Sequence, residues 1–307
     1  MILVGVDGGG TKTAAAAYED GRLLRKAAAG PMNYNYVGIE AAAGNLLEAI
    51  RALEIPLEKI AAVGIGDPSI DEGMPEGKLF RQFAEAIRQK VGIPVFIRSD
   101  AYITLFGLTG GRTPSVLTLS GTGAMSIAEN AAGEILTVGG WGRLTGDEGS
   151  GYFIAQEAIR AALMAADGVG PATALTRAVM EYFSVSTPRE LIHVFYGEHC
   201  PEIAGFAKIA AHCADEGDDR ALMILSEAAK YLAAYTSRLI TWSESRTVGV
   251  YGSVICKNRI VRREFERLLH ERFEPIRIIE PPVSATGATA LYAGMMLEKT
   301  EKENGHV

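Results

Sequence analysis

The sequence predicts an α/β fold built from two similar domains. Short apolar runs typical of buried strands alternate with helical patterns through the first half of the chain. A hairpin with a glycine- and threonine-rich tip opens each half, the first at Ile2–Tyr18 and the second at Ser115–Ala128. A chain of 307 residues is long enough for two domains of roughly 150 residues, each with its own buried core.

The first hairpin has the features of a phosphate-binding turn. Ile2–Val6 is an apolar, β-branched run, Gly8–Gly10 form a tight turn, and Ala14–Tyr18 resume a strand. Glycines have no Cβ, so a phosphate could approach the backbone N–H groups closely here. Thr11 and Lys12 add a hydroxyl and a positive charge. An ordinary hairpin turn is the alternative interpretation.

Asp7 stands at the end of the first strand, where it would face that phosphate. A carboxylate beside a polyphosphate needs a cation between them, and hydrated Mg²⁺ is the usual one. The second hairpin repeats the pattern with Gly121, Thr122 and Gly123 at its tip. Neither tip is a Walker A motif, and no Gly-x-Gly-x-x-Gly leads from a strand into a helix. The two hairpins therefore predict a phosphate clamp of another kind.

Charge and cysteine content limit the functional classes. The net charge of −7 argues against nucleic acid or an anionic membrane as the main partner, because both need a basic surface. Cys200, Cys213 and Cys256 are too few and too widely spaced for a disulfide framework or a Cys-x-x-Cys metal site. No secretory signal pattern and no run of about 18 apolar residues occurs. We expect a soluble protein of the reducing cytoplasm.

Five segments between the two hairpins continue the α/β pattern. They are a loop at Gly30–Tyr36, a helix at Ile39–Leu53, a strand at Ile60–Gly66, a helix at Leu79–Val91 and a strand at Val95–Arg98. Asn33 lies in the loop, where an asparagine either forms a turn or bonds a ligand hydroxyl. Both roles stay open on the sequence alone.

Asp100 follows the last of these strands. In open α/β sheets, ligands bind beyond the carboxyl ends of the strands, which makes Asp100 a candidate for chemistry. Aspartate is also a good N-cap, so a structural role at the start of the next helix fits the position equally well.

The segment Val138–Tyr152 is rich in glycine and interleaves Trp141, Arg143, Asp147 and Glu148. Such a composition favours neither a helix nor a regular strand. Ordering it costs backbone entropy, which a binding role would explain. An aromatic face beside carboxylate acceptors suits a sugar, and a tightly packed loop between domains is the structural alternative.

Long helices around one further strand are predicted for the rest of the chain. The predicted elements are helices at Ile154–Ala166, Ala221–Trp242 and Arg259–Arg272, a capped helix start at Ser186–Glu190, a strand at Val248–Val254 that ends in a Gly-Ser turn, and a last helix that begins within Pro281–Ala290. The apolar stripe that includes Ala228 and Leu232 is expected to face the core, whereas the charged residues of 259–272 are expected to be solvated. The histidines share no metal-ligand spacing.

Several motifs together resemble the N-acetylglucosamine kinase family, which belongs to the BadF/BadG/BcrA/BcrD group of the actin, sugar kinase and heat-shock 70 superfamily. The resemblance runs from the first strand to the last helix, and its most specific part is a Trp-Gly loop followed by Gly-Asp-Glu-Gly-Ser. The motifs are Asp7–Thr13, Ser99–Ala101, Leu119–Gly123, Gly139–Gly142, Gly146–Ser150, Ala204–Phe206, Lys208–Ala210, Ala214, Gly217–Asp218 and Tyr251–Val254.

The resemblance implies a kinase that transfers the γ-phosphate of ATP to the 6-hydroxyl of an amino sugar, with Asp100 as the catalytic base. It implies ATP contacts at Gly9, Gly10, Thr11, Lys12, Gly121, Thr122, Gly123, Ala214, Gly252 and Ser253. It implies sugar contacts at Asn33, Asp100, Gly140, Trp141, Gly142 and Asp147. Asp7 would hold Mg²⁺ through water, so the implied cofactors are ATP and Mg²⁺.

The resemblance also implies two ribonuclease H-like (actin-like ATPase) domains with a ligand cleft between them. We expect residues 1–112 to form the N-terminal domain, residues 113–283 to form the C-terminal domain with the adenosine site, and residues 284–307 to form a helix that returns to the first domain. Closure of the lobes would exclude water from the reaction. A homodimer is the implied assembly.

Two departures from the family limit the substrate. Asp67–Ser69 stands where relatives that hold a 2-acetamido group tend to have a serine-glycine turn, and Ala124 and Met125 replace a more polar pair of animal members. N-acetylglucosamine is the first expectation, and glucosamine, N-acetylmuramic acid, N-acetylmannosamine and glucose stay open.

Three functions of other classes fit the sequence less well. An ATP-driven dehydratase activator of the BadF type would need closely placed cysteines for an iron–sulfur cluster. A sugar-responsive transcription regulator would need a helix-turn-helix segment. A non-catalytic assembly protein of the actin type would leave Asp100 and the loop around Trp141 without an explanation.

Overall fold

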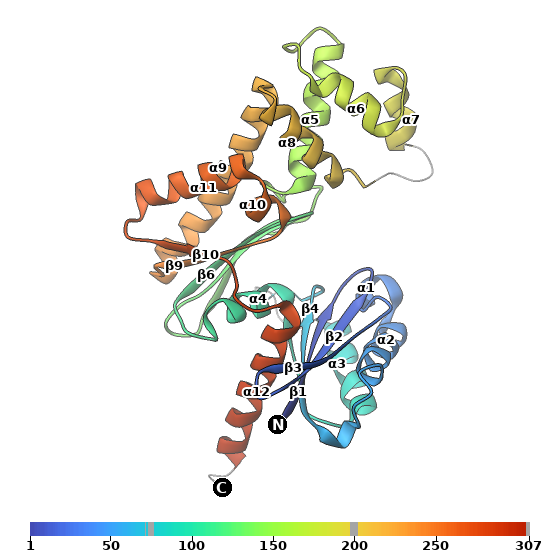
Figure 1. The fold of residues 1–307 in the computed structure, drawn as a ribbon, viewed down its shortest axis with the longest axis vertical. Coiled ribbons are helices and arrows are strands. Elements are labelled where there is room, and N and C mark those ends of the chain that lie inside the picture. The colour runs from blue at the N-terminus through green and yellow to red at the C-terminus, as the bar shows by residue number, and fades with distance from the viewer. Residues whose placement is uncertain (71, 73–76, 197–201, 305–307) are drawn as a thin grey trace. The chain divides into compact units, whose positions relative to one another are not determined.

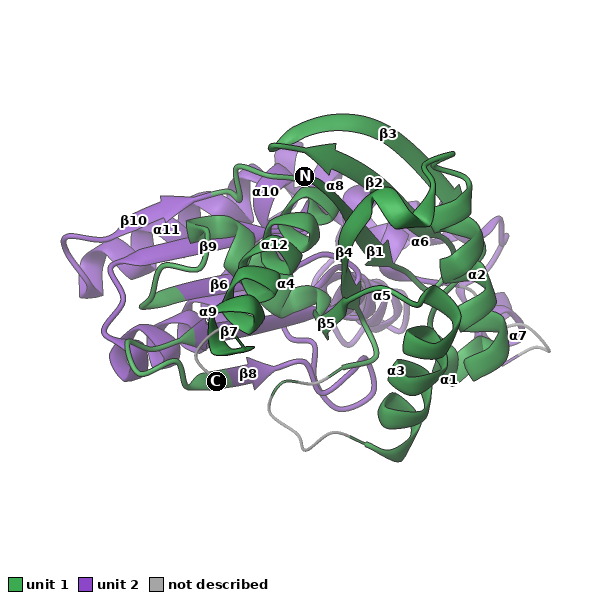
Figure 2. Cartoon of the chain, turned by 90° about the horizontal axis from the view of Figure 1, so that it is seen from below, with its two compact units in different colours: residues 1–115, 129–136, 280–307 green, residues 116–128, 137–279 purple. Residues whose placement is uncertain are grey.

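The computed structural model describes residues 1–70, 72, 77–196 and 202–304, so Cys200 lies outside the described residues. The chain forms two compact units, coloured separately in Figure 2. Unit 1 comprises residues 1–115, 129–136 and 280–307, and unit 2 comprises residues 116–128 and 137–279. Both units are α/β, as the sequence predicts.

Unit 1 contains a five-stranded mixed sheet in the order β3-β2-β1-β4-β5 (Figure 1). Its strands are β1 (Ile2–Gly8), β2 (Thr13–Glu19), β3 (Arg22–Ala29), β4 (Ile60–Asp67) and β5 (Val95–Ser99). The strand β2 runs antiparallel to its neighbours β1 and β3, and β4 and β5 run parallel to β1. The predicted first hairpin and the two predicted strands after it are confirmed.

The helices of unit 1 are α1 (Tyr34–Val37), α2 (Ile39–Arg51), α3 (Lys78–Val91), α4 (Asp100–Thr109) and α12 (Ala285–Asn304), with a 3-10 turn η1 at Leu57–Lys59. A buried core joins the sheet to α2 and α3, in which Val4 and Val6 of β1 meet Leu46 and Phe83. Apolar residues at alternate strand positions and at helical spacing produce this layer.

The opposite face of the same strands carries glycines, because α12 packs directly on the backbone there. A Cβ on Gly5 would lie 1.8 Å from the backbone oxygen of Thr286, and a Cβ on Gly64 would lie 2.0 Å from that of Thr289. Only glycine permits such an approach. The last helix of the chain therefore belongs to unit 1, beside β1, β4 and α4.

Unit 2 repeats this architecture. Its strands are β6 (Ser115–Ser120), β7 (Ala124–Glu129), β8 (Ile135–Gly139), β9 (Thr247–Tyr251) and β10 (Arg277–Ile279). Their order, β10-β9-β6-β7-β8, is that of unit 1 read from the other end, and β9 is parallel to β6 as β4 is to β1. The two glycine-rich hairpins thus open two similar sheets, as the sequence predicts.

The helices of unit 2 are α5 (Gly151–Ala166), α6 (Leu175–Phe183), α7 (Leu191–Tyr196), α8 (Ala207–Asp215), α9 (Asp219–Ser243), α10 (Ser253–Lys257) and α11 (Arg259–Arg272), with 3-10 turns η2 at Pro188–Glu190 and η3 at Ala204–Phe206. The predicted strand at Val248–Val254 is shorter than expected. It ends at Tyr251 because Gly252 adopts φ 105 and α10 begins at the next residue.

The long helix α9 is fixed to the sheet by a buried polar contact as well as by apolar packing. The hydroxyls of Thr118 on β6 and Thr236 on α9 are 2.6 Å apart. Ala228 and Leu232 of α9 are fully buried, so the predicted core stripe is confirmed. The charged helix α11 buries Val261, Phe265 and Leu269, and its charged residues are exposed or half-buried. None of the described helices is long and apolar enough to cross a membrane.

Candidate functional site

Three aspartates that are distant in the sequence stand at one edge of the unit 1 sheet. The strands β1, β4 and β5 are parallel, and their register pairs Asp7 with Gly66 and Asp67 with Ser99. Asp100 follows Ser99 directly. Because the carboxyl ends of parallel strands meet at the same edge, the fold brings Asp7, Asp67 and Asp100 together.

Burial is the largest influence on all three carboxyl groups, and it raises the pKa of each. The negative charge of Asp100 raises the pKa of Asp7 and Asp67 further, and the positive charge of Lys12 lowers the pKa of Asp7. The pKa of Asp67 rises to about 6. This edge of the sheet is therefore suited to bind a cation and to accept a proton.

Asp100 is the first residue of α4 and does not cap it. The cap is Ser99, whose Oγ accepts a hydrogen bond from the Tyr102 N–H at 3.0 Å. The alternative that Asp100 serves as the N-cap is therefore wrong. Asp100 Oδ1 accepts a hydrogen bond from the Ala101 N–H at 2.7 Å, and this bond partly offsets the rise in its pKa. The group is a half-buried carboxylate that is more basic than a solvated one.

Asp67 differs from its two neighbours because no solvent reaches it. Its side chain is fully buried, and Oδ1 accepts a hydrogen bond from the Ser69 N–H at 2.8 Å. Within the described residues, Oδ2 has no hydrogen-bond partner. A buried carboxyl with an unpaired oxygen is costly when ionised, which is why its pKa is high.

Asp7 fits a hydrated magnesium ion better than a dehydrated one. Its carboxyl group interacts with the charges of Asp100 and Lys12. Among the described residues, no three His, Cys, Asp or Glu side chains are placed to hold a metal ion together. Mg²⁺ commonly keeps several waters and takes further ligands from phosphate oxygens, so a single carboxylate such as that of Asp7 would be enough to hold it through water.

Backbone contacts hold the tip of the first hairpin in place at Gly9, and the residues that follow are exposed to solvent. A Cβ on Gly9 would lie 2.7 Å from the Lys12 backbone oxygen, and the Gly9 oxygen accepts a hydrogen bond from the Met32 N–H at 3.1 Å. Nothing lies within 4 Å of a Cβ on Gly10, and Gly10, Thr11 and Lys12 are exposed. The predicted phosphate contacts of this loop are thus open to solvent.

Asn33 forms the turn that one of its two predicted roles requires. It caps α1, and its Oδ1 accepts a hydrogen bond from the Asn35 N–H at 3.1 Å. The side chain is half-buried. The turn role is confirmed, and a sugar contact at Asn33 stays a prediction.

The second hairpin joins two other segments of unit 2. The Gly121 oxygen accepts a hydrogen bond from the Gly151 N–H at 2.8 Å, which ties the start of α5 to the hairpin tip. On the other side, a Cβ on Gly252 would lie 2.4 Å from the Ser120 oxygen. The carboxyl ends of β6 and β9 and the amino end of α5 therefore meet at one place.

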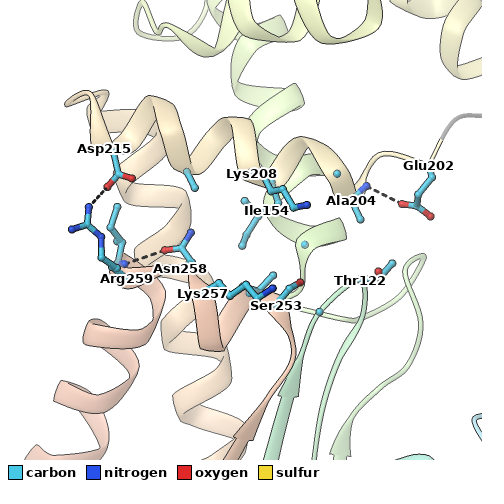
Figure 3. Close-up of a pocket in the computed structure, with 17 residues that line it drawn as sticks. Thr122, Ile154, Glu202, Ala204, Lys208, Asp215, Ser253, Lys257, Asn258 and Arg259 are labelled. Atoms are coloured by element: carbon cyan, nitrogen blue, oxygen red, sulfur yellow. Dashed lines mark hydrogen bonds and ion pairs between the residues drawn. The ribbon is translucent and has the colours of Figure 1, made fainter. Parts of the chain in front are cut away.

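A cavity of about 510 Å³ opens at this meeting point (Figure 3). Of the predicted ATP contacts, Gly121, Thr122 and Ser253 line it. Ala214 does not, since it is buried in α8, although Ala211 and Asp215 of the same helix do. The remaining lining residues are Gly151, Ile154, Glu202, Ala204, Gly205, Ala207, Lys208, Val254, Lys257, Asn258, Arg259 and Ile260.

Two lysines in this cavity were not predicted as site residues. Lys208 extends from α8 and Lys257 from the end of α10, and both face the hollow in Figure 3. Lys208 lies in one of the motifs of the sequence resemblance, so a signal for it was present. Lys257 gave no signal, because it follows a segment that was predicted as strand up to Val254.

The loop after β8 owes its shape to residues with left-handed backbone. Gly140, Gly142 and Asp147 have φ values of 75, 82 and 60. The Gly146 N–H donates to the Gly142 oxygen at 2.9 Å, so the loop is ordered by its own backbone. Trp141 is 77% exposed, which leaves its ring available to a ligand.

A second cavity, of about 740 Å³, lies in unit 1. Polar groups from several elements line it, including Tyr34, Asn35, Ser69, Lys78 and Arg98. Arg98 is two residues before Asp100, so this cavity adjoins the strand that leads to the aspartate cluster.

The sequence was also compared with models of known protein families. The model of the BadF/BadG/BcrA/BcrD ATPase family matches residues 4–292. This chain belongs to that family. The family is one of ATPases, which supports ATP as a ligand of this chain.

Individual proteins of other organisms are also similar to this chain. The chain is 29% identical over 290 residues, 90% of this chain and 93% of the relative, to the N-acetylmuramic acid/N-acetylglucosamine kinase of Clostridium acetobutylicum. It is 29% identical over 246 residues, 75% of this chain and 76% of the relative, to the N-acetyl-D-glucosamine kinase of Dictyostelium discoideum.

A solved structure has the same fold. The protein from Chromobacterium violaceum, provisionally described as an N-acetylglucosamine kinase, superimposes with a TM-score of 0.75 at 26% identity. The match covers 94% of this chain and 98% of that one. The two-unit architecture is thus shared over nearly the whole length.

Proposed function

We propose that this protein is an ATP-dependent kinase that transfers the γ-phosphate of ATP to the 6-hydroxyl of an amino sugar, with N-acetylglucosamine as the first candidate. The observation that carries the proposal is the position of Asp100. It is a half-buried carboxylate of raised pKa at the carboxyl edge of a parallel sheet, beside Asp7 and the first phosphate hairpin.

Asp100 would act by orienting the sugar hydroxyl and accepting its proton. The hydroxyl oxygen attacks the γ-phosphorus, the bond to the β-phosphate oxygen breaks, and ADP leaves. Because phosphoryl transfer has a loose transition state, positioning and charge neutralisation provide most of the acceleration. The raised pKa of Asp100 makes it a better proton acceptor than a solvated aspartate.

The phosphates would be held by the two hairpin tips. The exposed Gly10, Thr11 and Lys12 offer N–H groups, a hydroxyl and a charge, and Thr122 offers a second hydroxyl at the cavity of unit 2. Magnesium held through water by Asp7 would neutralise charge on the phosphates. Ser253 and Gly252 would border the adenosine, and Lys208 and Lys257 add positive charge in the same cavity.

The sugar would be bound by Asn33 and Asp100 of unit 1 and by Gly140, Trp141, Gly142 and Asp147 of unit 2. From the sequence resemblance we infer that the lobes close on the substrates, which would exclude water as a competing acceptor. We further infer a cytoplasmic homodimer, on the sequence resemblance and the composition. The relatives named above are kinases of N-acetylglucosamine or N-acetylmuramic acid, which supports an amino sugar.

The test is ADP release with Mg-ATP in the presence of single sugars. The panel contains N-acetylglucosamine, N-acetylmuramic acid, glucosamine, N-acetylmannosamine, glucose and a control without sugar. We expect strong turnover with N-acetylglucosamine and a new phosphate ester at carbon 6, detected by ³¹P NMR. Equal ADP release with and without every sugar would overturn the proposal and favour an ATPase activator of the BadF type.

A further inference from the structure

Glu72, in the segment between β4 and α3, reaches across to β5. Its Oε1 accepts hydrogen bonds from Arg98 Nε at 3.0 Å and from the Ser99 N–H at 2.9 Å. Its Oε2 accepts from Arg98 Nη2 at 2.8 Å. One carboxylate thus holds both the guanidinium and the backbone at the end of the strand, in the bidentate geometry that is strongest for this pair.

Arg98 is fixed on its other side by an aromatic ring. Its guanidinium lies 3.9 Å from the centre of the Tyr102 ring, and Tyr102 meets Tyr292 of α12 edge-to-face at 6.0 Å. The Tyr102 hydroxyl donates to Glu129 at 3.3 Å. The side chains of Glu72 and Arg98 are 11% and 28% exposed, so the pair is largely shielded from water.

These contacts surround the point at which β5 becomes α4. Glu72 binds Arg98 and Ser99, Ser99 caps α4 through the Tyr102 N–H, and Asp100 lies between them as the first helical residue. The backbone before Asp100 is therefore fixed by Glu72, and the backbone after it by the cap.

We propose that Glu72 and Arg98 are positioning residues for Asp100. They touch neither ATP nor the sugar hydroxyl in this role. They fix the strand end, and the strand end fixes the direction of the Asp100 carboxylate toward the hydroxyl. This inference rests on the proposed function, because it assumes that Asp100 is the base.

The first test is the variant Glu72→Gln, which keeps the shape of the side chain. Its amide NH₂ cannot accept a hydrogen bond, so at least one of the three bonds is lost together with the charge. We expect kcat to fall about 10- to 100-fold, as expected for a displaced catalytic group, while KM for sugar and for ATP changes less than about threefold. Arg98→Lys, which keeps the charge but loses the fork and the ring contact, should act in the same way.

The decisive measurement combines Glu72→Gln with Asp100→Asn. If Glu72 acts through Asp100, the loss in kcat is not repeated once the base is gone, and the double variant matches Asp100→Asn alone. A general structural role would instead lower the residual rate of Asp100→Asn by the same factor. The matched control is Glu40→Gln, which removes an exposed pair with Lys90 in the same unit and should leave kcat unchanged.

Three results separate this inference from the proposed function. An active wild type with a folded Glu72→Gln variant of unchanged kcat overturns the positioning role alone. The positioning role is also overturned if kcat of the double variant falls by the product of the two single losses. This holds even if Glu72→Gln alone is slow. A wild type that phosphorylates no sugar overturns the proposed function, and the inference falls with it. Circular dichroism at the assay temperature confirms folding, and Arg98→Lys replaces Glu72→Gln if the latter unfolds.

Discussion

The Asp147 carboxylate lies directly against Gly123 in the second hairpin, where a Cβ would meet Asp147 Oδ2 at 3.0 Å. Burial raises the pKa of this carboxylate, and the nearby backbone of Ala124 and Gly142 partly offsets that rise. The loop around Trp141 and the second hairpin are therefore joined through Asp147. A substitution in the loop is therefore expected to alter the conformation of the hairpin, and a substitution in the hairpin that of the loop.

Asp147→Asn should weaken sugar binding more than ATP binding. The amide keeps the shape but is a weaker acceptor than a carboxylate for a sugar hydroxyl, a loss of about 1.4 kcal/mol or about tenfold in affinity. We expect KM for the sugar to rise about tenfold and KM for ATP to change less than threefold, in steady-state assays with each substrate varied in turn. Asp167→Asn, at the exposed C-cap of α5, is the control. An unchanged sugar KM would remove Asp147 from the proposed sugar contacts.

Lys257→Met and Lys208→Met should each raise KM for ATP. A cation that lines the cavity of unit 2 stabilises the bound triphosphate, so its removal is expected to cost about tenfold in ATP affinity while sugar KM is retained. Lys230→Met is the matched control, since Lys230 pairs with Glu227 on the surface of α9. Titration of a fluorescent ATP analogue gives the affinity directly. If neither variant binds the analogue more weakly than wild type, the cavity does not hold the nucleotide.

Asp67 should make the stability of the protein depend on pH. The ordinary pKa of an aspartate is 3.8, and burial raises the pKa of Asp67 to about 6, so the folded state binds the proton more tightly than the unfolded state. The free energy of unfolding therefore falls as pH rises from about 3 to about 7, by about 3 kcal/mol for this group, and is then constant.

Asp67→Asn isolates this contribution, because the amide does not titrate. Urea unfolding with EDTA present should show that the variant gains stability relative to wild type by about 3 kcal/mol between about pH 3 and about pH 7. If the amide itself changes the free energy of unfolding, it does so by the same amount at every pH. The change of the stability difference with pH is therefore unaffected. A difference that is flat with pH would show that Asp67 has the same pKa in the folded and the unfolded protein, and would contradict the raised pKa.

Gly5→Ala should destabilise unit 1 strongly. The new Cβ would lie 1.8 Å from the Thr286 backbone oxygen, so α12 must move off the sheet, at a cost of about 3 kcal/mol. Gly44→Ala is the matched control, because a Cβ there meets nothing within 4 Å and Gly44 lies in the middle of α2. We expect that variant to be stabilised by about 1 kcal/mol. Thermal unfolding of the two variants distinguishes an effect of close packing from a general effect of removing glycine. A Gly5→Ala protein as stable as wild type would contradict the close packing of α12 on the sheet.

The local patterns of the sequence determined the elements and the class of the fold. Apolar runs in β1 and β4, helical spacing in α2 and α9, and glycine at the hairpin tips set the secondary structure before any tertiary contact was known. The position of Asp100 after a strand indicated chemistry, because ligands bind at the carboxyl edge of open parallel sheets. The family resemblance added the roles of the residues, which no local pattern provides.

The tertiary structure alone decided which distant groups meet. Parallel pairing brought Asp67 beside Asp7 and Asp100, and a segment between β4 and α3 placed Glu72 on Arg98. It also placed Lys257 in the lining of the cavity of unit 2 and buried Ala214, which does not line that cavity. Such contacts depend on strand order and on the closure of long loops, whereas sequence patterns record only the face that each residue presents within its own element.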